Sequence, residues 1–306
     1  MNFDKIDQVK ILVVGDIMLD KYVVGNVKRI SPEAPVPVVN VIEEYSTLGG
    51  CGNVVRNIVE LGAKVDCLAS VGHDINSGVI AQHLLQLGVG TLLVTGSERS
   101  TLKERIIAEH RAVQMLRIDR EVTKDVDADL VIKKFESESK NDYSMVVVSD
   151  YAKGMITHKL MTYLKENVSA KIIIDPKPQH GVMYNNVFMI TPNEQEWGSM
   201  VLSSAYVLDN VDYILKTMGP QGMALINRDG EEDLIKAEPV NVYNVSGAGD
   251  TVVAIMAVCL SMGFDPYTAA KFANHCAGYV VTQPGTSVVP KNKFMNMLGR
   301  YIQGDF

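Results

Sequence analysis

Residues Asn244 to Thr251 read Asn-Val-Ser-Gly-Ala-Gly-Asp-Thr, and an uncharged apolar run from Val252 to Met262 follows them. The run contains no helix-breaking residue, so we predict a buried helix there. The Gly-Ala-Gly turn would leave backbone N–H groups at the helix N-terminus, where the helix dipole and the unpaired donors attract an anion. Asp250 adds a carboxylate beside this site. A carboxylate repels phosphate but accepts protons well, so the stretch predicts a phosphoryl group held by backbone donors next to a general base.

The same stretch has a plainer interpretation. Aspartate is favoured in the first turn of any helix, and glycine-rich turns often precede helices. Under this interpretation Asp250 is only a helix cap. The choice between the two depends on the rest of the chain.

Composition restricts the class of protein. The chain has 306 residues, of which 47% are apolar and 21% charged, as expected for a globular protein with a full-sized core. Its net charge of −7 and its lack of long basic runs argue against a nucleic-acid-binding groove. The four cysteines form no C-x-x-C pair and no zinc-ligand spacing, which favours reduced thiols. Since the sequence shows neither a signal-peptide pattern nor a membrane-length apolar stretch, we expect a cytoplasmic protein.

Short apolar runs alternate with amphipathic stretches along most of the chain. The runs are typical of buried strands and the stretches of helices. Their alternation predicts an α/β fold, a doubly wound and mostly parallel sheet with helices on both faces. The predicted strands are 10–15, 65–72, 91–95, 145–149, 171–175, 187–191 and 223–227, and the predicted helices are 53–61, 78–87, 128–140, 157–167, 252–262 and 291–302.

Two β-rich segments interrupt this alternation. They lie within 23–42 and 100–119, and both lack a clean helical period. We expect a single domain over 1–306 in which segments near 17–42 and 98–119 form a small β-sheet lid. Such a lid would exclude water from a phosphoryl transfer. Two long surface hairpins are the alternative.

Polar residues follow several of the predicted strands. Asp16, Asp150, Asp175 and Asn193 all stand at or just beyond a strand's carboxyl end. In open α/β sheets this edge is where ligands bind. We therefore expect the functional site at this edge.

Three motifs in order resemble those of PfkB-type (ribokinase-like) sugar kinases. They are Gly49-Gly50 followed by Asn53, Thr191-Pro-Asn-Glu-Gln-Glu196, and Ser246-Gly-Ala-Gly-Asp250. Further stretches resemble the D-glycero-β-D-manno-heptose-7-phosphate kinases, which form the kinase half of bifunctional ADP-heptose synthases. These stretches are GDIMLD (15–20), RISPEAPVPV (29–38), SDYAKG (149–154) and IDPK (174–177). The resemblance runs from about Lys10 to Pro290, and it leaves open whether the chain is a stand-alone kinase or a kinase fragment.

The resemblance implies an ATP-dependent transfer to the anomeric O1 of heptose 7-phosphate, giving the 1,7-bisphosphate. Asp250 would be the base, and the backbone of Gly247, Ala248 and Gly249 would hold the transferring group. The product would feed ADP-heptose biosynthesis for cell-surface lipopolysaccharide. A Walker A motif is absent from the sequence, which disfavours a P-loop enzyme.

The resemblance also implies the substrate ligands. Each has a structural alternative, as a helix cap, a strand-end turn or a solvated charge. The implied sugar contacts are Asp16, Asp20, Gly49, Gly50, Asn53, Asp150 and Lys153. The implied ligands of the sugar's 7-phosphate are Lys103, Arg105 and Arg117, with Lys153 as a further candidate.

The nucleotide side is implied in the same way. Asn193 and Glu196 would organise Mg²⁺ and phosphates through water, although their N-x-x-E spacing equally predicts a capping box. Asn244 stands where related kinases often carry aspartate, which leaves a monovalent-cation requirement open. The implied nucleotide contacts are Lys177, Asn193, Thr217, Gly219, Gly222 and Asn274.

The expected partners are ATP and a small sugar phosphate, with neither nucleic acid nor membrane. A homodimer through the lid sheets is also expected, because a small sheet exposes edges that a second copy can cover. Three alternatives remain open. A related kinase would act on another sugar, sugar phosphate or nucleoside, and a non-catalytic sugar-binding protein would share the fold. A dinucleotide oxidoreductase would need G-x-G-x-x-G after the first strand, which the sequence lacks.

Overall fold

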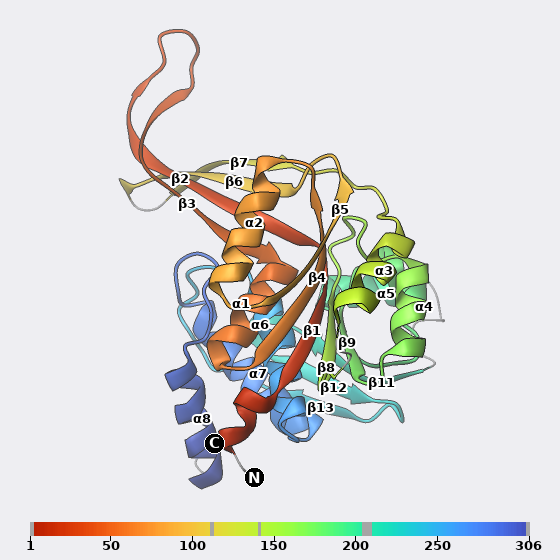
Figure 1. Cartoon of the computed structure of the whole chain (residues 1–306). Coiled ribbons are helices and arrows are strands. Elements are labelled where there is room, and N and C mark those ends of the chain that lie inside the picture. The colour runs from red at the N-terminus through yellow and green to blue at the C-terminus, as the bar shows by residue number, and fades with distance from the viewer. Residues whose placement is uncertain (1–2, 111–112, 140–141, 204–209, 304–306) are drawn as a thin grey trace.

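The computed structural model describes residues 3–110, 113–139, 142–203 and 210–303. Within these residues the strands form a large sheet of nine strands and a small sheet of four (Figure 1). The large sheet has the order β13-β12-β11-β10-β9-β8-β1-β4-β5. Its strands are β1 (Lys10–Gly15), β4 (Lys64–Gly72), β5 (Gly90–Ser97), β8 (Met145–Ser149), β9 (Lys171–Asp175), β10 (Val187–Ile190), β11 (Val211–Thr217), β12 (Met223–Asn227) and β13 (Glu232–Ile235).

The large sheet is mostly parallel, as the sequence predicts. The strands from β11 to β5 pair in parallel, and β12 and β13 add an antiparallel edge. β1 is buried from Ile11 to Gly15 because helices cover both faces of the sheet. Its side chains alternate between two hydrophobic clusters, with Ile11 and Val13 in one and Leu12 and Val14 in the other.

These two clusters identify the helical layers. On the side of Ile11 and Val13, the core includes residues of α1 (Cys51–Leu61), α2 (Ile75–Gln86), α6 (Ala248–Ser261), α7 (Pro266–Val280) and α8 (Lys291–Gln303). On the other side it includes residues of α3 (Ala128–Glu138), α4 (His158–Asn167) and α5 (Glu194–Ser203). The doubly wound α/β prediction is thus confirmed.

Helix α6 is the central helix of the first layer. It is buried from Asp250 through Cys259, which agrees with the uncharged run in the sequence. It contacts α1, α7, β8 and β9. An apolar helix packed on all sides holds its N-terminus rigidly, and the first turn carries Asp250.

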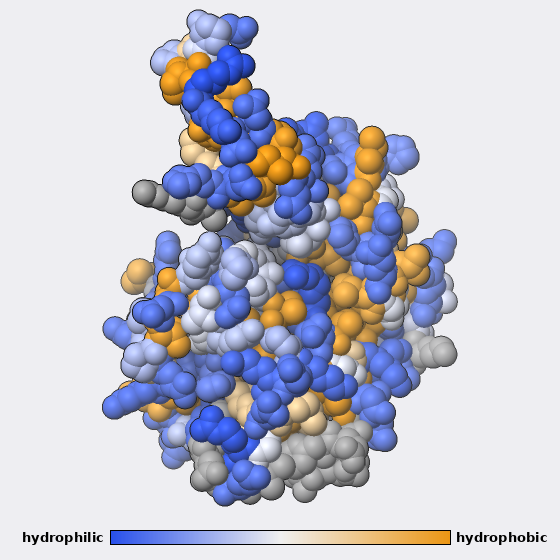
Figure 2. All heavy atoms as spheres, turned by 90° about the vertical axis from the view of Figure 1, so that its left-hand side faces the viewer, coloured by the Kyte–Doolittle hydropathy of each residue, from blue (hydrophilic) through white to orange (hydrophobic). Residues whose placement is uncertain are grey.

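The small sheet has the order β3-β2-β6-β7 and stands above the carboxyl ends of the large sheet's strands (Figure 1). Its strands are β2 (Ile17–Ile30), β3 (Pro37–Gly50), β6 (Thr101–Ala108) and β7 (Val113–Arg120). The β-rich segments outside the main sheet are therefore confirmed. The tip of the β2–β3 hairpin projects away from the rest of the molecule, and Figure 2 shows apolar side chains among the polar ones on it.

Two strands of the large sheet were not predicted. β11 mixes buried and half-buried positions, and only Ile235 of β13 is buried, so neither strand shows a continuous apolar run. Lys140, at the end of the predicted helix 128–140, lies outside the described residues. In the described part of the chain, every helix is too short or too polar to cross a membrane.

Candidate active site

Asp250 lies in the first turn of α6, and its side chain is held from two sides. Asn53 of α1 donates from Nδ2 to Asp250 Oδ2 at 2.8 Å. The hydroxyl of Tyr151, in the loop after β8, donates to Oδ1 at 2.8 Å. Asp250 is only 5% exposed. Two donors from distant segments thus fix a nearly buried carboxylate.

The environment of Asp250 suits a proton acceptor. Burial is the largest effect on the pKa of Asp250 and raises it to about 6. The hydrogen bonds from Asn53 and Tyr151 lower this pKa but do not outweigh the burial. The charge of Asp20 raises this pKa and that of Lys177 lowers it. A carboxylate with a pKa near 6 is mostly ionised at neutral pH and is a stronger base than an ordinary aspartate.

The Gly-Ala-Gly turn leaves backbone donors at the start of α6. Gly247 is the N-cap with φ of 82°, and a Cβ there would lie 2.7 Å from Asn53 Nδ2, so glycine is required on both counts. Within the described residues, the N–H groups of Gly247, Gly249 and Asp250 have no protein acceptor, whereas the Ala248 N–H donates to Val245 O at 3.3 Å. Free backbone donors at a helix N-terminus attract anions, so the anion site predicted beside Asp250 remains a prediction that this geometry supports.

Asn53 is itself oriented by a cation. The Arg56 guanidinium donates from Nη1 to Asn53 Oδ1 at 3.2 Å and to Thr286 O at 3.1 Å. A donor on Oδ1 turns the amide so that its nitrogen faces Asp250. Arg56 is absent from the predicted site residues, although its i+3 spacing from Asn53 places both on one face of α1.

Tyr151 is positioned by a tightly bonded turn. The buried carboxylate of Asp16 accepts three backbone N–H groups, from Tyr151 at 2.8 Å, Lys153 at 3.1 Å and Met155 at 3.0 Å. Burial raises the pKa of Asp16, although these bonds lower it. Ala152 has φ of 53°, a strained conformation for a residue other than glycine. These contacts fix the backbone that carries Tyr151.

Asp150 supports the same turn from inside the protein. It is fully buried, and its carboxylate accepts from the Ala152 N–H at 2.7 Å and from the Tyr184 hydroxyl at 2.6 Å. His180 Nδ1 also contacts it at 2.6 Å. Asp16 and Asp150 therefore both help to shape the turn that carries Tyr151, and their direct contacts with a sugar remain a prediction.

The small sheet carries a shielded ion pair. Asp20 of β2 accepts from Arg105 Nη1 of β6 at 2.6 Å, and the two side chains are only 7% and 15% exposed. Arg105 also lies over the Tyr22 ring at 5.4 Å. Gly49 lets the chain pass close to this pair, since a Cβ there would lie 2.4 Å from Asp20 Oδ2. Gly50 is the N-cap of α1, and a Cβ there would lie 2.3 Å from the backbone oxygen of Asp16.

The other predicted ligands of the sugar's 7-phosphate differ in whether they already have an ion-pair partner in the protein. Lys103 pairs in register with Asp20 and is half-buried, with no hydrogen-bond or ion-pair partner in the described residues. Arg117 is exposed and pairs with Asp119 at 2.9 Å. Lys153 pairs with Glu121 at 2.7 Å. On β6, Arg105 thus pairs with Asp20, and Lys103 lies opposite Asp20 in the register.

The predicted nucleotide residues gather at the ends of β9, β10 and β11. Lys177 pairs with Glu196, and Glu196 forms a capping box with Asn193: Asn193 N–H donates to Glu196 Oε2 at 3.0 Å, and Glu196 N–H to Asn193 Oδ1 at 2.8 Å. Asn193 also bridges to Thr217. The turn after β11 is closed by a bond from Met218 N–H to Gly222 O at 2.8 Å around Gly219. Asn274 instead donates to Lys236 O at 2.8 Å.

A family model for pfkB family carbohydrate kinases matches residues 8–292. This chain belongs to the pfkB family of carbohydrate kinases. It is accordingly an ATP-dependent sugar kinase.

Curated relatives of this kinase carry the name bifunctional protein HldE. The one from Desulfatibacillum aliphaticivorans is 39% identical over 300 residues, which cover 92% of this chain and 61% of that protein. The one from Hydrogenovibrio crunogenus is 36% identical over 304 residues, which cover 95% of this chain and 63% of that protein. The chain therefore spans about three fifths of the length of these relatives.

Solved structures confirm the ribokinase-like fold. Phosphofructokinase-2 from Escherichia coli, in complex with potassium, has a TM-score of 0.76 and 16% identity, and the match covers 96% of this chain and 99% of that one. Ribokinase from Thermotoga maritima has a TM-score of 0.71 and 19% identity, with coverage of 95% and 99%. At these identities the likeness concerns the fold.

The kinase gathers several acidic groups near Asp250. Removal from water raises the pKa of Asp175 well above its usual range, and the charges of Asp250 and Glu196 raise it further. The charge of Lys177 lowers this pKa but does not offset the increase. Excess negative charge of this kind suits a divalent cation. However, no three potential ligands in the described residues are arranged to hold a metal directly. The residues fit a cation that arrives with the nucleotide and keeps its water ligands.

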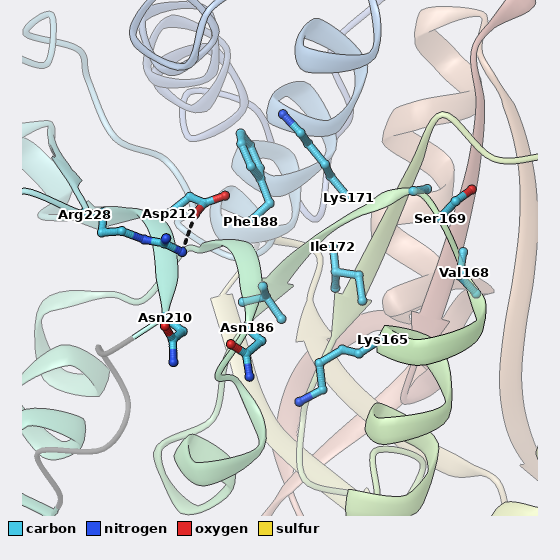
Figure 3. A pocket seen from close by; sticks show the side chains of 12 residues that line it. Lys165, Val168, Ser169, Lys171, Ile172, Asn186, Phe188, Asn210, Asp212 and Arg228 are labelled. Atoms are coloured by element: carbon cyan, nitrogen blue, oxygen red, sulfur yellow. Dashed lines mark ion pairs between the residues drawn. The ribbon is translucent and has the colours of Figure 1, made fainter.

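A separate pocket of about 380 Å³ lies at the opposite edge of the large sheet, at the amino ends of β9, β10 and β11 (Figure 3). Its cations already have partners in the protein. Arg228 pairs with Asp212 at 2.7 Å, as the dashed line in Figure 3 marks. Lys165 donates to Asn185 Oδ1 at 2.9 Å. This pocket is distant from the kinase site, and we assign it no part in catalysis.

Proposed function

We propose that this kinase transfers the γ-phosphoryl group of ATP to the anomeric O1 of D-glycero-β-D-manno-heptose 7-phosphate and forms the 1,7-bisphosphate. The reaction would supply a precursor of ADP-heptose for lipopolysaccharide. The similarity to proteins named HldE supports this choice within the family.

The observation that carries the proposal is the shielded Asp20–Arg105 pair close to Asp250. The charge of Asp20 raises the pKa of Asp250, so the two carboxylates share one electrostatic environment. A sugar phosphate offers what this arrangement can bind, because its hydroxyls donate to carboxylates and its phosphate pairs with a guanidinium. An unphosphorylated sugar or a nucleoside would leave Arg105 without a new anionic partner.

The chain's own groups then account for the transfer. Asp250 accepts the proton of the attacking hydroxyl, and the free N–H groups of Gly249 and Asp250 stabilise negative charge on the phosphoryl oxygens. The lid excludes water that would hydrolyse ATP. Mg²⁺, when bound, would neutralise phosphate charge. Asn193 and Glu196 are proposed to organise it through water, with Lys177, Thr217, Gly219, Gly222 and Asn274 on the nucleotide side.

An acceptor panel with ATP and Mg²⁺ tests the proposal. It would contain heptose 7-phosphate, other sugar phosphates, unphosphorylated sugars and nucleosides, with ADP release as the readout. Phosphorus NMR would locate the new phosphate. We expect the highest kcat/KM with heptose 7-phosphate and phosphorylation at O1. A higher kcat/KM with another acceptor would identify that acceptor as the substrate. Sugar binding without ADP release would indicate a non-catalytic protein.

We also propose that a second copy of the chain covers the lid. Within the described residues, β3 and β7 are edge strands that each pair on one side only. The hairpin exposes apolar side chains, namely Ile30 and Val36 at its tip and Val41 and Ile42 farther along β3. Unpaired edges and apolar side chains together favour association. Light scattering at micromolar concentration should give twice the chain mass, and Ile42→Lys should reduce it; a monomer in both would reject the dimer.

A further inference from the structure

Tyr151 touches both sides of the site. Its hydroxyl donates to Asp250 Oδ1 at 2.8 Å, and its backbone N–H donates to Asp16 Oδ2 at 2.8 Å. Its ring lies beneath the ammonium of Lys177, with Nζ 5.4 Å from the ring centroid. One half-buried side chain therefore contacts both the catalytic base and a residue of the nucleotide side.

Lys177 connects this ring to the start of α5. Its ammonium pairs with Glu196, whose other carboxylate oxygen accepts the Asn193 N–H at 3.0 Å. Burial lowers the pKa of Lys177, but the bond to Glu196 and the charge of Asp175 outweigh this effect and raise it. The lysine over the ring is therefore a stable cation. Any ligand phosphate that draws Lys177 away from Glu196 also changes the charge above the Tyr151 ring.

The backbone of Tyr151 has little freedom to follow such a change. The Asp16 carboxylate holds the N–H groups of residues 151, 153 and 155, and the adjacent Ala152 has φ of 53°. A fixed backbone limits the response to the side chain, whose hydroxyl ends on Asp250. The Tyr151 side chain thus contacts both Asp250 and the Lys177 ammonium directly.

We propose that Tyr151 is a positioning residue that orients the Asp250 carboxylate through its hydroxyl and couples it, through its ring, to the Lys177–Glu196 pair on the nucleotide side. This inference rests on the proposed role of Asp250 as the base. It adds to that role a residue that lies within the SDYAKG stretch (149–154) but is absent from the predicted site residues. Tyr151 does not itself accept the sugar proton in this scheme.

Other charged and titratable groups also act on Asp250 and have to be separated from Tyr151. They come from several elements, namely Asp20 of β2, Cys51 and Arg56 of α1, Asp175 of β9, and Lys177 in the loop after it. Among the described side chains, only Asn53 and Tyr151 donate hydrogen bonds to the carboxylate. Removal of the Tyr151 hydroxyl alone leaves all the formal charges in place.

The test compares Tyr151→Phe, Tyr151→Leu and Asp250→Asn with the unmodified chain. For each protein, kcat and KM are measured from pH 5 to 9 with Mg-ATP and the acceptor that gives the highest turnover in the panel. Tyr151→Phe retains the ring but loses the bond to an ionised acceptor, so the acid limb of kcat/KM should move up by about one pH unit. The KM for Mg-ATP should stay unchanged in this variant.

Tyr151→Leu removes the ring as well, and the KM for Mg-ATP should rise about two- to fivefold in addition. An unmoved acid limb in Tyr151→Phe, or an unchanged KM for Mg-ATP in Tyr151→Leu, would overturn the coupling. If Tyr151→Leu does not fold, as judged by thermal unfolding, the phenylalanine variant decides alone. Full turnover in Asp250→Asn would instead reject the base assignment, so the two failures remain distinguishable.

Discussion

Asn53 Nδ2 lies 2.8 Å from Asp250 Oδ2, although the two residues are 197 positions apart in the chain. The contact joins the N-terminal part of α1 to the first turn of α6. Gly247 makes room for it, because any side chain there would collide with the asparagine amide. The glycine turn therefore has two structural effects: it leaves backbone donors free, and it admits the asparagine that orients the Asp250 carboxylate.

Asp250→Asn should abolish most of the turnover without preventing binding. Asparagine has nearly the same shape but accepts no proton, so we expect kcat to fall about 10²–10⁴-fold. Dissociation constants for sugar and nucleotide should change far less, as calorimetry can determine. Turnover equal to that of the unmodified chain would refute the base assignment.

The pH dependence of the reaction should reflect Asp250. Burial raises its pKa to about 6, and only the ionised form accepts a proton. The logarithm of kcat/KM for the sugar should therefore rise with slope one below pH 6 and level off above it. Stability should depend on pH in the opposite direction to activity. The folded state binds the Asp250 proton more tightly than the unfolded state does, so the contribution of Asp250 to the free energy of unfolding increases as pH falls from 6 toward 4. An acid limb near pH 4 would contradict the assigned environment.

Gly247→Ala should destabilise the protein and impair catalysis together. The residue has φ of 82°, which costs alanine about 1–2 kcal/mol, and the new Cβ would displace Asn53. Gly249→Ala is the matched control, since a Cβ there has nothing within 4 Å. Thermal unfolding should show a lower Tm for Gly247→Ala and no loss for Gly249→Ala. Equal Tm values for the two variants would reject the steric argument.

Arg105→Met should weaken the binding of a phosphorylated acceptor. Loss of a charge-assisted bond of about 1.5–3 kcal/mol would raise its KM about 10- to 150-fold, with a small effect on kcat. Arg117→Met is the comparison, because this guanidinium is exposed and pairs with Asp119. Initial rates with the panel's best sugar phosphate decide the outcome. A larger effect from Arg117→Met would move the phosphate site outward along β7.

Much of the fold was predictable because its signals are local. The apolar run in β1 and the uncharged run in α6 each reflect burial on all sides. Such burial can be predicted without knowing which elements pack against the segment. β13 was missed because three of its four residues are exposed and carry no periodic signal. The glycine turn before α6 was also predictable, since helix N-termini have recognisable composition.

The individual ligands were less predictable. Asp16, Asp20 and Asp150 look alike in the sequence, yet one binds three backbone N–H groups, one pairs with Arg105 and one is fully buried. Their roles depend on which donors the fold brings to each carboxylate. Arg56 and Tyr151 were missed for the same reason, because their partners come from segments far along the chain.

The sequence by itself determined the layered α/β architecture, the glycine turn before α6 and the carboxylate in the first turn of that helix. The physical reason is that burial periodicity and backbone conformation depend on residues that are close together in the chain. Only the tertiary structure decided which carboxylate remains available as a base and which serve the backbone. That distinction arises from desolvation and hydrogen bonding, and both depend on atoms that the folded chain brings together from α1, β8 and α6.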